Sequence, residues 1–179
     1  MKLAERWLLD RLERSQQGLS LIELLLVLAL TGIIGAVATM SISQVFTTAA
    51  ISNDQNTAIN QVRNAGHWIS RDVQMAQSVT PDSGDSGFPL SLKWLDYDGD
   101  EHWVVYILVG GELNREHYTN YDPVTNPDPD ATTFVAQLID LNPATTNCDF
   151  TDGVFTVTIT AEVNGKSETR TFEVKPRPD

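Results

Sequence analysis

The chain has 179 residues and carries 24 Asp and Glu against 12 Lys and Arg, which gives a formal net charge of −12. This length predicts one domain, or one domain with an anchor. The acidic charge excludes a protein that binds nucleic acid directly, because such a protein needs clustered basic residues to neutralise phosphates. The single cysteine, Cys148, excludes an intramolecular disulfide.

An apolar run begins directly after Gly18, whereas residues 1–18 are polar and charged. The run contains 17 residues from Leu24 to Met40 without a charge. A helix needs about 17 to 25 mostly apolar residues to cross the hydrocarbon core of a bilayer. The sequence therefore predicts a transmembrane helix over about 19–42.

A secretory signal peptide is the alternative reading of this run, since Ala36-Val37-Ala38 has the small residues of a signal-peptidase site. The apolar region of a signal peptide usually has about 7 to 15 residues. This run is longer, and its helical spacing continues past the small residues. We therefore favour an anchor.

Glu23 is the one charged residue inside the apolar run. A charged side chain within a membrane helix costs roughly 2.5–3.5 kcal/mol, and such residues usually have a function. If the chain were cut after Gly18, Leu19 would gain a free amino group and Glu23 would be the fifth residue of the product. The two groups can pair within one chain or between neighbouring chains. The alternative is an acid near the end of the span that reaches the lipid headgroups.

The stretch from Gly18 to Leu25, GLSLIELL, closely resembles the processing motif of type IV pilins and type II secretion pseudopilins. The resemblance implies that a prepilin peptidase cuts between Gly18 and Leu19 and methylates Leu19. It also implies that Glu23 recruits the subunit into a filament by pairing with a neighbour's N-terminus. The family usually has Phe at the first mature position, where this chain has Leu19.

The same resemblance implies partners and a location. The partners are the prepilin peptidase, the membrane and other pilin or pseudopilin subunits. The chain would cross the cytoplasmic membrane once, with a cytoplasmic N-terminus and an extracytoplasmic C-terminal domain, and would then enter a pilus or pseudopilus.

Helical spacing of apolar residues continues well beyond the predicted span. Val62, Gly66, Ile69 and Val73 follow one another at steps of four and three, which is typical of an amphipathic helix. Pro81 gives a stop signal. We therefore expect a cytoplasmic leader over 1–18, one long helix over 19–80 and an extracytoplasmic β-rich domain over 81–179.

The C-terminal part of the chain alternates apolar and polar residues in short runs between turn signals. Gly110-Gly111 and Asn164-Gly165 predict tight hairpin turns. Strands are expected over 90–95, 102–109, 112–118, 134–141, 154–161 and 168–174. One antiparallel sheet of about four to six strands against the apolar stripe of the helix gives an α+β fold.

Three further stretches resemble J-type minor pseudopilins and related minor pilins. They are residues 68–76, residues 111–115 and residues 170–177. This second resemblance implies a minor subunit, located at the tip of a filament.

An acidic turn offers the main candidate metal site, and Asp122, Asp128 and Asp130 form a second acidic loop. Asp96, Asp98 and Asp100 alternate as they do in part of a calcium loop. The glutamate that completes such a loop is missing, because the residues after Asp100 read as a strand. Asp-Gly turns are also common without a metal, so we expect no cofactor and keep calcium as the alternative.

No catalytic motif stands out in the sequence. His67, His102 and His117 lack the close spacing of zinc ligands, although His102 and His117 can meet across the predicted hairpin. We expect a structural subunit and no enzyme. Two other classes stay open: a membrane-anchored extracytoplasmic binding module that does not polymerise, and an anchored hydrolase or calcium-dependent enzyme.

Overall fold

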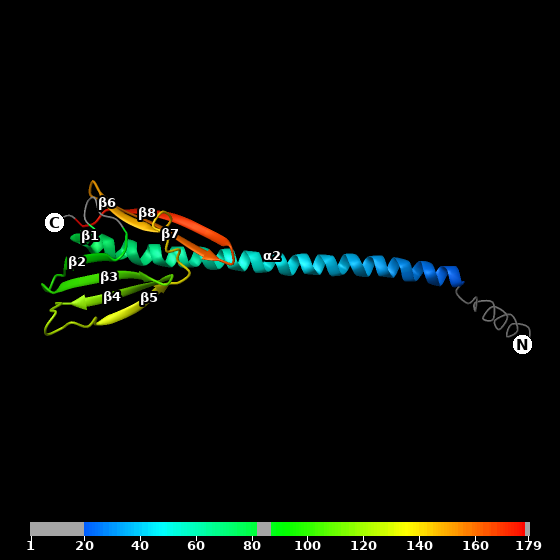
Figure 1. Ribbon diagram of the computed structural model, residues 1–179, viewed down its shortest axis with the longest axis horizontal. Coiled ribbons are helices and arrows are strands. Elements are labelled where there is room, and N and C mark those ends of the chain that lie inside the picture. The colour runs from blue at the N-terminus through cyan, green and yellow to red at the C-terminus, as the bar shows by residue number, and fades with distance from the viewer. Residues whose placement is uncertain (1–19, 82–86, 178–179) are drawn as a thin grey trace, which may run out of the picture. The chain divides into compact units, whose positions relative to one another are not determined.

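The computed structural model describes residues 20–81 and 87–177. The described residues form one long helix and eight strands (Figure 1). The elements are α2 (Leu21–Met75), β1 (Ser78–Thr80), β2 (Leu90–Leu95), β3 (Glu101–Val109), β4 (Glu112–Thr119), β5 (Ala131–Ala136), β6 (Asn147–Thr151), β7 (Val154–Val163) and β8 (Lys166–Val174). The chain divides into two compact units, residues 1–49 and residues 50–179. Each unit is described by itself.

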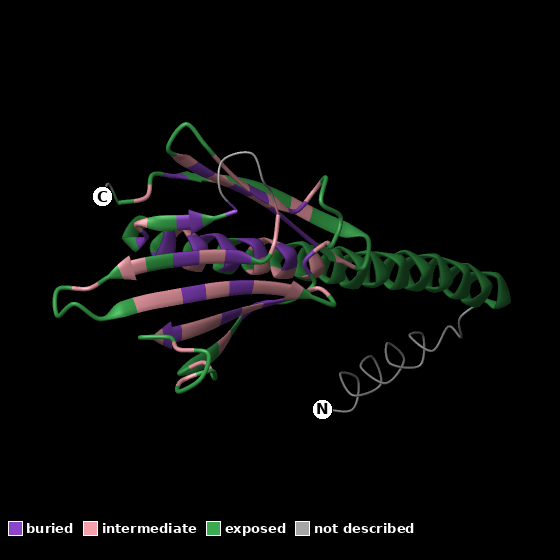
Figure 2. Ribbon diagram, turned by 60° about the vertical axis from the view of Figure 1, so that its left-hand side comes forward, coloured by how far each residue is buried: buried purple, intermediate pink, exposed green. Residues whose placement is uncertain are grey.

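The part of α2 in the second unit buries one stripe of small and apolar side chains. The buried helix residues are Ala58, Val62, Ala65, Gly66, Ile69, Asp72 and Val73. Their spacing of three and four residues places them on one face of the helix, as the sequence predicts. Figure 2 shows these turns in purple among the strands.

The helix ends earlier than predicted. The sequence places its end at residue 80, just before Pro81, but α2 ends at Met75. The Gln77 amide donates to the Lys93 carbonyl at 2.8 Å, and Ser78–Thr80 then pair with β2 as an edge strand. The expected helix to residue 80 is wrong because hydrogen bonds to β2 replace its last helical turn.

Five strands form the first sheet, in the order β1-β2-β3-β4-β5, and every neighbouring pair is antiparallel. The strands β3 and β4 form the hairpin that Gly110-Gly111 predicts. Both glycines have positive φ, 63° and 83°, which suits the tight turn that joins two twisted strands. We call this sheet A.

Three strands form a second sheet, in the order β6-β7-β8, which we call sheet B. Asn164 and Gly165 make its tight turn with φ of 48° and 75°. The expectation of a single sheet is wrong, because the chain leaves sheet A after Ala136. Ile139 then forms a bridge to Ala161 of β7, beyond the end of β6. The predicted strand over 134–141 is therefore replaced by β5, which begins at Ala131.

Both sheets pack on α2 within the second unit. Sheet A contacts the helix at Asp72, which is bonded to Tyr106 of β3. Sheet B contacts it at Gly66, where the ring of Phe172 occupies the space that a side chain would fill. The helix therefore lies between the sheets, as Figures 1 and 2 show.

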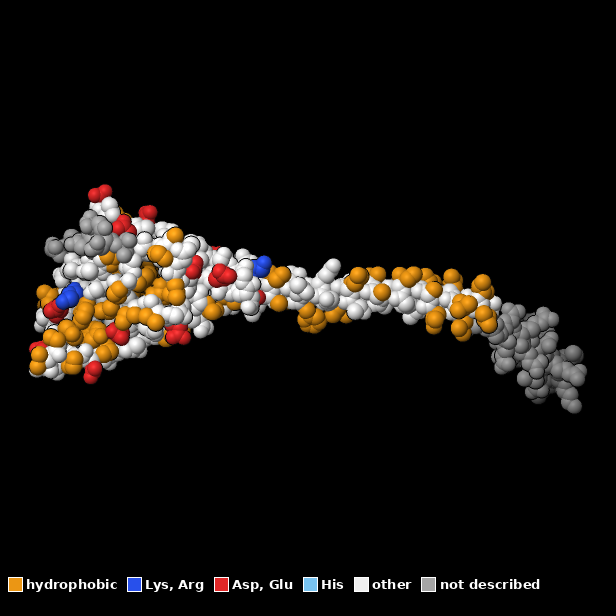
Figure 3. Space-filling view, viewed as in Figure 1, with side chains coloured by type: hydrophobic (Ala, Val, Ile, Leu, Met, Phe, Trp, Pro, Cys, Tyr) orange, Lys and Arg blue, Asp and Glu red, His pale blue; other side chains and the backbone are white. Residues whose placement is uncertain are grey.

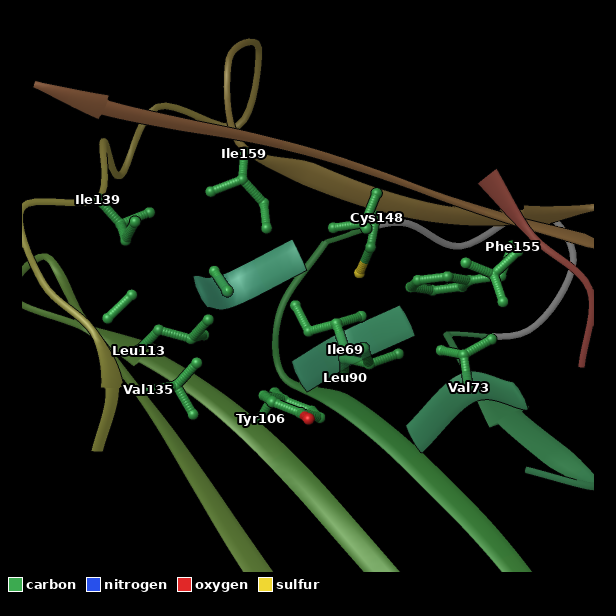
Figure 4. Close-up of a cluster of buried hydrophobic side chains, with 14 of the residues drawn as sticks. Ile69, Val73, Leu90, Tyr106, Leu113, Val135, Ile139, Cys148, Phe155 and Ile159 are labelled. Atoms are coloured by element: carbon green, nitrogen blue, oxygen red, sulfur yellow. The ribbon is translucent and has the colours of Figure 1, made fainter. Parts of the chain in front are cut away.

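One continuous cluster of buried side chains joins the three layers (Figure 4). Ile69 of the helix, Leu90 and Tyr106 of sheet A, and Phe155 and Ile159 of sheet B are each at most 1% exposed. Burying a large apolar side chain stabilises a fold by roughly 1.5–3 kcal/mol. The α+β architecture, a long N-terminal helix packed on antiparallel strands, is confirmed.

Candidate functional site

Glu23 lies in the first turn of α2 and is exposed. The carbonyl of Ser20 accepts bonds from the amides of Glu23 and Leu24 at 2.9 and 3.1 Å, so Ser20 is the N-cap. A carboxylate in the first turn is favoured by the partial positive charge of the helix N-terminus. Within the described residues, 20–81 and 87–177, the Glu23 side chain forms no hydrogen bond or ion pair. The partner that the sequence predicts, an amino group at the chain's own N-terminus or on a neighbour, lies outside the described residues.

The helix that follows Glu23 exposes a long apolar surface. Its exposed large apolar residues include Leu25, Leu28, Ile34, Met40 and Phe46, each at least 55% accessible. Among the described residues, α2 is the one helix long and apolar enough to cross a membrane. A soluble protein rarely exposes so large an apolar surface. Lipid or other apolar helices must cover it, and the segment is a membrane anchor.

Hydroxyl groups inside this apolar segment are satisfied by the helix itself. Thr31, Thr39 and Ser41 donate to the carbonyls four residues earlier at 2.6, 2.9 and 2.9 Å. Such bonds remove the need for water at these positions, which suits a nonpolar environment. From residue 20 to residue 53, Glu23 is the one charged side chain of the described helix.

The two residues of the predicted cleavage site, Gly18 and Leu19, lie outside the described residues. Cleavage between them and methylation of Leu19 stay predictions, and so does the assembly role of Glu23.

A buried polar cluster, which the sequence analysis missed, lies between α2 and sheet A. The Asp72 carboxylate is completely buried and accepts bonds from the Tyr106 hydroxyl at 2.6 Å and from Arg115 Nε at 2.5 Å. Burial, followed by the Asp72 charge, raises the pKa of Tyr106. One signal could have identified Asp72, since it lies three residues after Ile69 on the apolar stripe. The cluster fixes the helix against the sheet and leaves no reacting group exposed.

The acidic turn after β2 uses Asp96 to hold its own backbone. Asp96 Oδ1 accepts the amides of Asp98 and Asp100 at 2.9 and 3.0 Å. Within the part of the chain that the structure describes, no three His, Cys, Asp or Glu residues are placed to hold a metal ion. The expectation of no cofactor, with calcium at this turn as its alternative, stays a prediction.

The structure brings His102 and His117 together, as the sequence left open, whereas His67 is exposed on α2. His102 Nδ1 lies 3.0 Å from His117 Nε2, and His102 Nε2 lies 3.1 Å from Asp96 Oδ2. Since an ionised Asp96 only accepts, His102 Nε2 is the donor to Asp96, and in the neutral tautomer His102 Nδ1 then accepts from His117. The bond with His102, followed by the backbone bonds, lowers the pKa of Asp96. Burial is the main cause that lowers the pKa of His117.

One comparison with known proteins identifies the N-terminal segment. The family model described as the prokaryotic N-terminal methylation motif matches residues 14–39. These residues include Gly18, Leu19, Glu23 and most of the apolar run. Searches of curated proteins and of solved structures found no match.

The matched motif and the geometry agree on the same segment. The motif places a processed N-terminus next to a membrane-anchoring helix, and the structure places Glu23 in the first turn of that helix. Prepilin peptidase and other pilin subunits are the partners that the motif implies. The chain carries the N-terminal methylation motif, and this match supports its place in the type IV pilin and pseudopilin family.

Proposed function

We propose that this chain is a minor structural subunit of a type IV pilus or a type II secretion pseudopilus. In this proposal a prepilin peptidase cuts between Gly18 and Leu19, and the helix holds the subunit in the cytoplasmic membrane with its C-terminal domain outside. The subunit then enters a filament or its tip complex. Its role is structural, without catalysis and without a cofactor.

The single observation that carries the proposal is the position of Glu23. It is a lone carboxylate in the first turn of an apolar helix, and the next charged residue along the chain is Asp54. A charge at such a position is unfavourable in lipid unless it has a partner. The amino group of Leu19, freed by cleavage, has the opposite charge and is only four residues from Glu23 in the sequence.

Pairing between neighbours gives assembly a direction. When Glu23 of one subunit pairs with the amino terminus of the next, the two opposite charges neutralise each other. In lipid, each of them would have no partner. Such a pair also fixes the axial offset between adjacent helices, since a slip would leave both charges unpaired in an apolar environment.

The distribution of charge supports a minor subunit. Residues 50–179 hold 20 Asp and Glu against 8 Lys and Arg, so all of the net charge of −12 lies in the second unit. A major subunit packs against many copies of itself, and like charges at those contacts would be unfavourable. A chain present in few copies, among subunits of other sequence, avoids this repulsion.

The test replaces Glu23 with glutamine in the full-length chain, in cells that assemble the filament. Glu23→Gln keeps the shape and removes the charge, and Asp54→Asn is the matched control on the same helix. We expect both variants to insert in the membrane and to be cleaved, and Glu23→Gln alone to be missing from sheared filaments.

Normal incorporation of Glu23→Gln would contradict the proposed role of this carboxylate. If the variant also kept its cellular function without any filament, an anchored binding module that does not polymerise would replace the proposal.

A further inference from the structure

The central strand of sheet A presents an apolar outer face. Val104 and Tyr106 of β3 are fully buried toward the helix, so the alternating residues face away from it. Those outward residues are Trp103, Val105, Ile107 and Val109, which we call the apolar strip. None of the four packs against the buried core. The strip therefore contributes nothing to the interior that the structure contains.

Sheet B provides an internal comparison. Phe155, Val157 and Ile159 of β7 face the helix, and the residues between them, Thr156 and Thr158, face outward. The outward neighbours on β8 are also polar, and Thr158 bonds to Thr171 at 2.9 Å. One-sided antiparallel sheets usually alternate apolar inside and polar outside in this way. Sheet B follows the rule, and the central strand of sheet A does not.

An aromatic cluster borders one end of the apolar strip. The ring of Trp103 stacks on Tyr118 at a centroid distance of 4.9 Å and meets Tyr121 edge-on at 4.5 Å. Tyr118 is only 8% exposed although it lies on the outer face, because these neighbours cover it. Rigid Trp and Tyr side chains dominate the binding energy of many protein interfaces. Figure 3 shows hydrophobic side chains on the surface over the strands of the second unit.

A polar and mostly acidic rim surrounds the strip. Across the register of sheet A, Val109 faces Glu112, Val105 faces Glu116, and Trp103 faces Lys93. Lys93 is paired with Glu101 at 3.2 Å. The rim therefore carries one Lys against three Glu. An apolar centre with a polar rim is the usual anatomy of a protein interface.

From these observations we propose that the outer face of sheet A docks a second, different subunit of the same filament. That partner presents an apolar surface flanked by Lys or Arg. This partner assignment rests on the proposed function, since it takes the occupant from the same assembly. A second copy of this chain would place acidic rim against acidic rim, and anionic lipid headgroups would be repelled in the same way.

The test uses the full-length chain in the cells that assemble the filament. A photo-crosslinking phenylalanine derivative replaces Ile107, in the middle of the strip, or Thr158, on the outer face of sheet B, as the matched control. We expect Ile107 to crosslink one partner at least about tenfold more strongly than Thr158 does. Mass spectrometry then identifies the crosslinked peptide. The expected peptide comes from a protein with its own N-terminal methylation motif and holds apolar residues beside Lys or Arg.

Two variants test the charge argument on the same surface. Glu112→Lys reverses a rim charge, and we expect it to weaken the Ile107 crosslink. Ser167→Lys, on the outer face of sheet B, should leave that crosslink unchanged. Unaltered thermal unfolding of both variants shows that neither change acts through the fold.

The other outcomes overturn the inference. They are equal crosslinking at Ile107 and Thr158, a crosslink to a second copy of this chain, a crosslink to lipid, or a stronger crosslink in Glu112→Lys. If one of these outcomes occurs while Glu23→Gln still blocks assembly, the docking inference is wrong. The proposed function as a filament subunit is then retained. If the chain never enters a filament, the proposed function fails first.

Discussion

Arg115 Nε donates to the buried carboxylate of Asp72 at 2.5 Å and thereby joins β4 to the helix across 43 residues of sequence. The Asp72 side chain is 0% exposed and that of Arg115 is 10% exposed, so water does little to screen the pair. The Tyr106 hydroxyl donates to the same carboxylate oxygen, and Arg71 contacts the other oxygen. This cluster is a buried polar contact that helps to hold α2 at a defined rotation against sheet A.

Removal of this carboxylate should destabilise the second unit strongly. Asp72→Ala leaves Arg115 buried without a counter-charge, and breaking a buried pair in this way costs about 3–5 kcal/mol. Thermal unfolding of the full-length chain in detergent measures the loss. Arg71→Ala is the control, because Arg71 contacts the same carboxylate at 3.3 Å but is 49% exposed, and exposed pairs contribute about 1 kcal/mol or less. Equal effects of the two variants would contradict the role given to Arg115.

Position 66 of the helix, where Gly66 contacts the ring of Phe172, should not tolerate a larger side chain. A Cβ at Gly66 would overlap the ring of Phe172, and overpacking of a core costs about 1–3 kcal/mol. We expect Gly66→Ala to lower the unfolding temperature, and Phe172→Leu in the same chain to restore part of it. Gly32→Ala, where nothing lies within 4 Å, controls for the change in helix propensity. A stabilised Gly66→Ala variant would show that sheet B does not pack here.

Acid should weaken the second unit through His117. Burial, with the charges of Arg115 and His102, lowers the pKa of His117 below its ordinary 6.5, while Asp130 and Asp72 oppose the shift. The folded state therefore binds this proton less tightly than the unfolded chain does. The stabilising contribution is complete above pH 6.5 and is lost as the pH falls through the lowered pKa.

Unfolding temperatures between about pH 8 and pH 5 test this dependence. The fall in unfolding temperature with falling pH should be shallower in His117→Gln than in the unaltered chain. It should be unchanged in His67→Gln, since His67 is exposed. A decline that His117→Gln leaves intact would assign the effect to other groups.

Calcium should have no effect on the acidic turn. Asp96 Oδ1 already accepts two backbone amides, and Asp96 Oδ2 lies against His102. We expect the same unfolding temperature in millimolar calcium and in chelator. A rise with calcium that Asp98→Asn abolishes would establish the metal site instead.

Local patterns predicted much of the fold. The bounds of β2 match the sequence prediction, and those of β3 and β4 lie within one residue of it, because alternation and Gly110-Gly111 specify them locally. The strands β1 and β6 were missed because they are short and depend on pairing with β2 and β7. The division into two sheets depends on the bridge between Ile139 and Ala161, which no local signal reveals.

The candidate site divides in the same way. Glu23 was predicted because a lone acid in an apolar run is visible in sequence, and the structure places it in the first helical turn. The apolar strip of β3 was not recognised as a surface, since a strand with one face in the core and one face outward reads like a fully buried strand when both are apolar. The contrast with β7 becomes visible only when the helix shows which side is inside.

The most direct test of the account is the intact mass and N-terminal residue of the full-length chain, produced with and without a prepilin peptidase. The account predicts a peptidase-dependent product that begins at Leu19, with one added methyl group if Leu19 is methylated. A chain that still begins at Met1 in the presence of the peptidase, or one cut after Ala38, would contradict the proposal of a filament subunit.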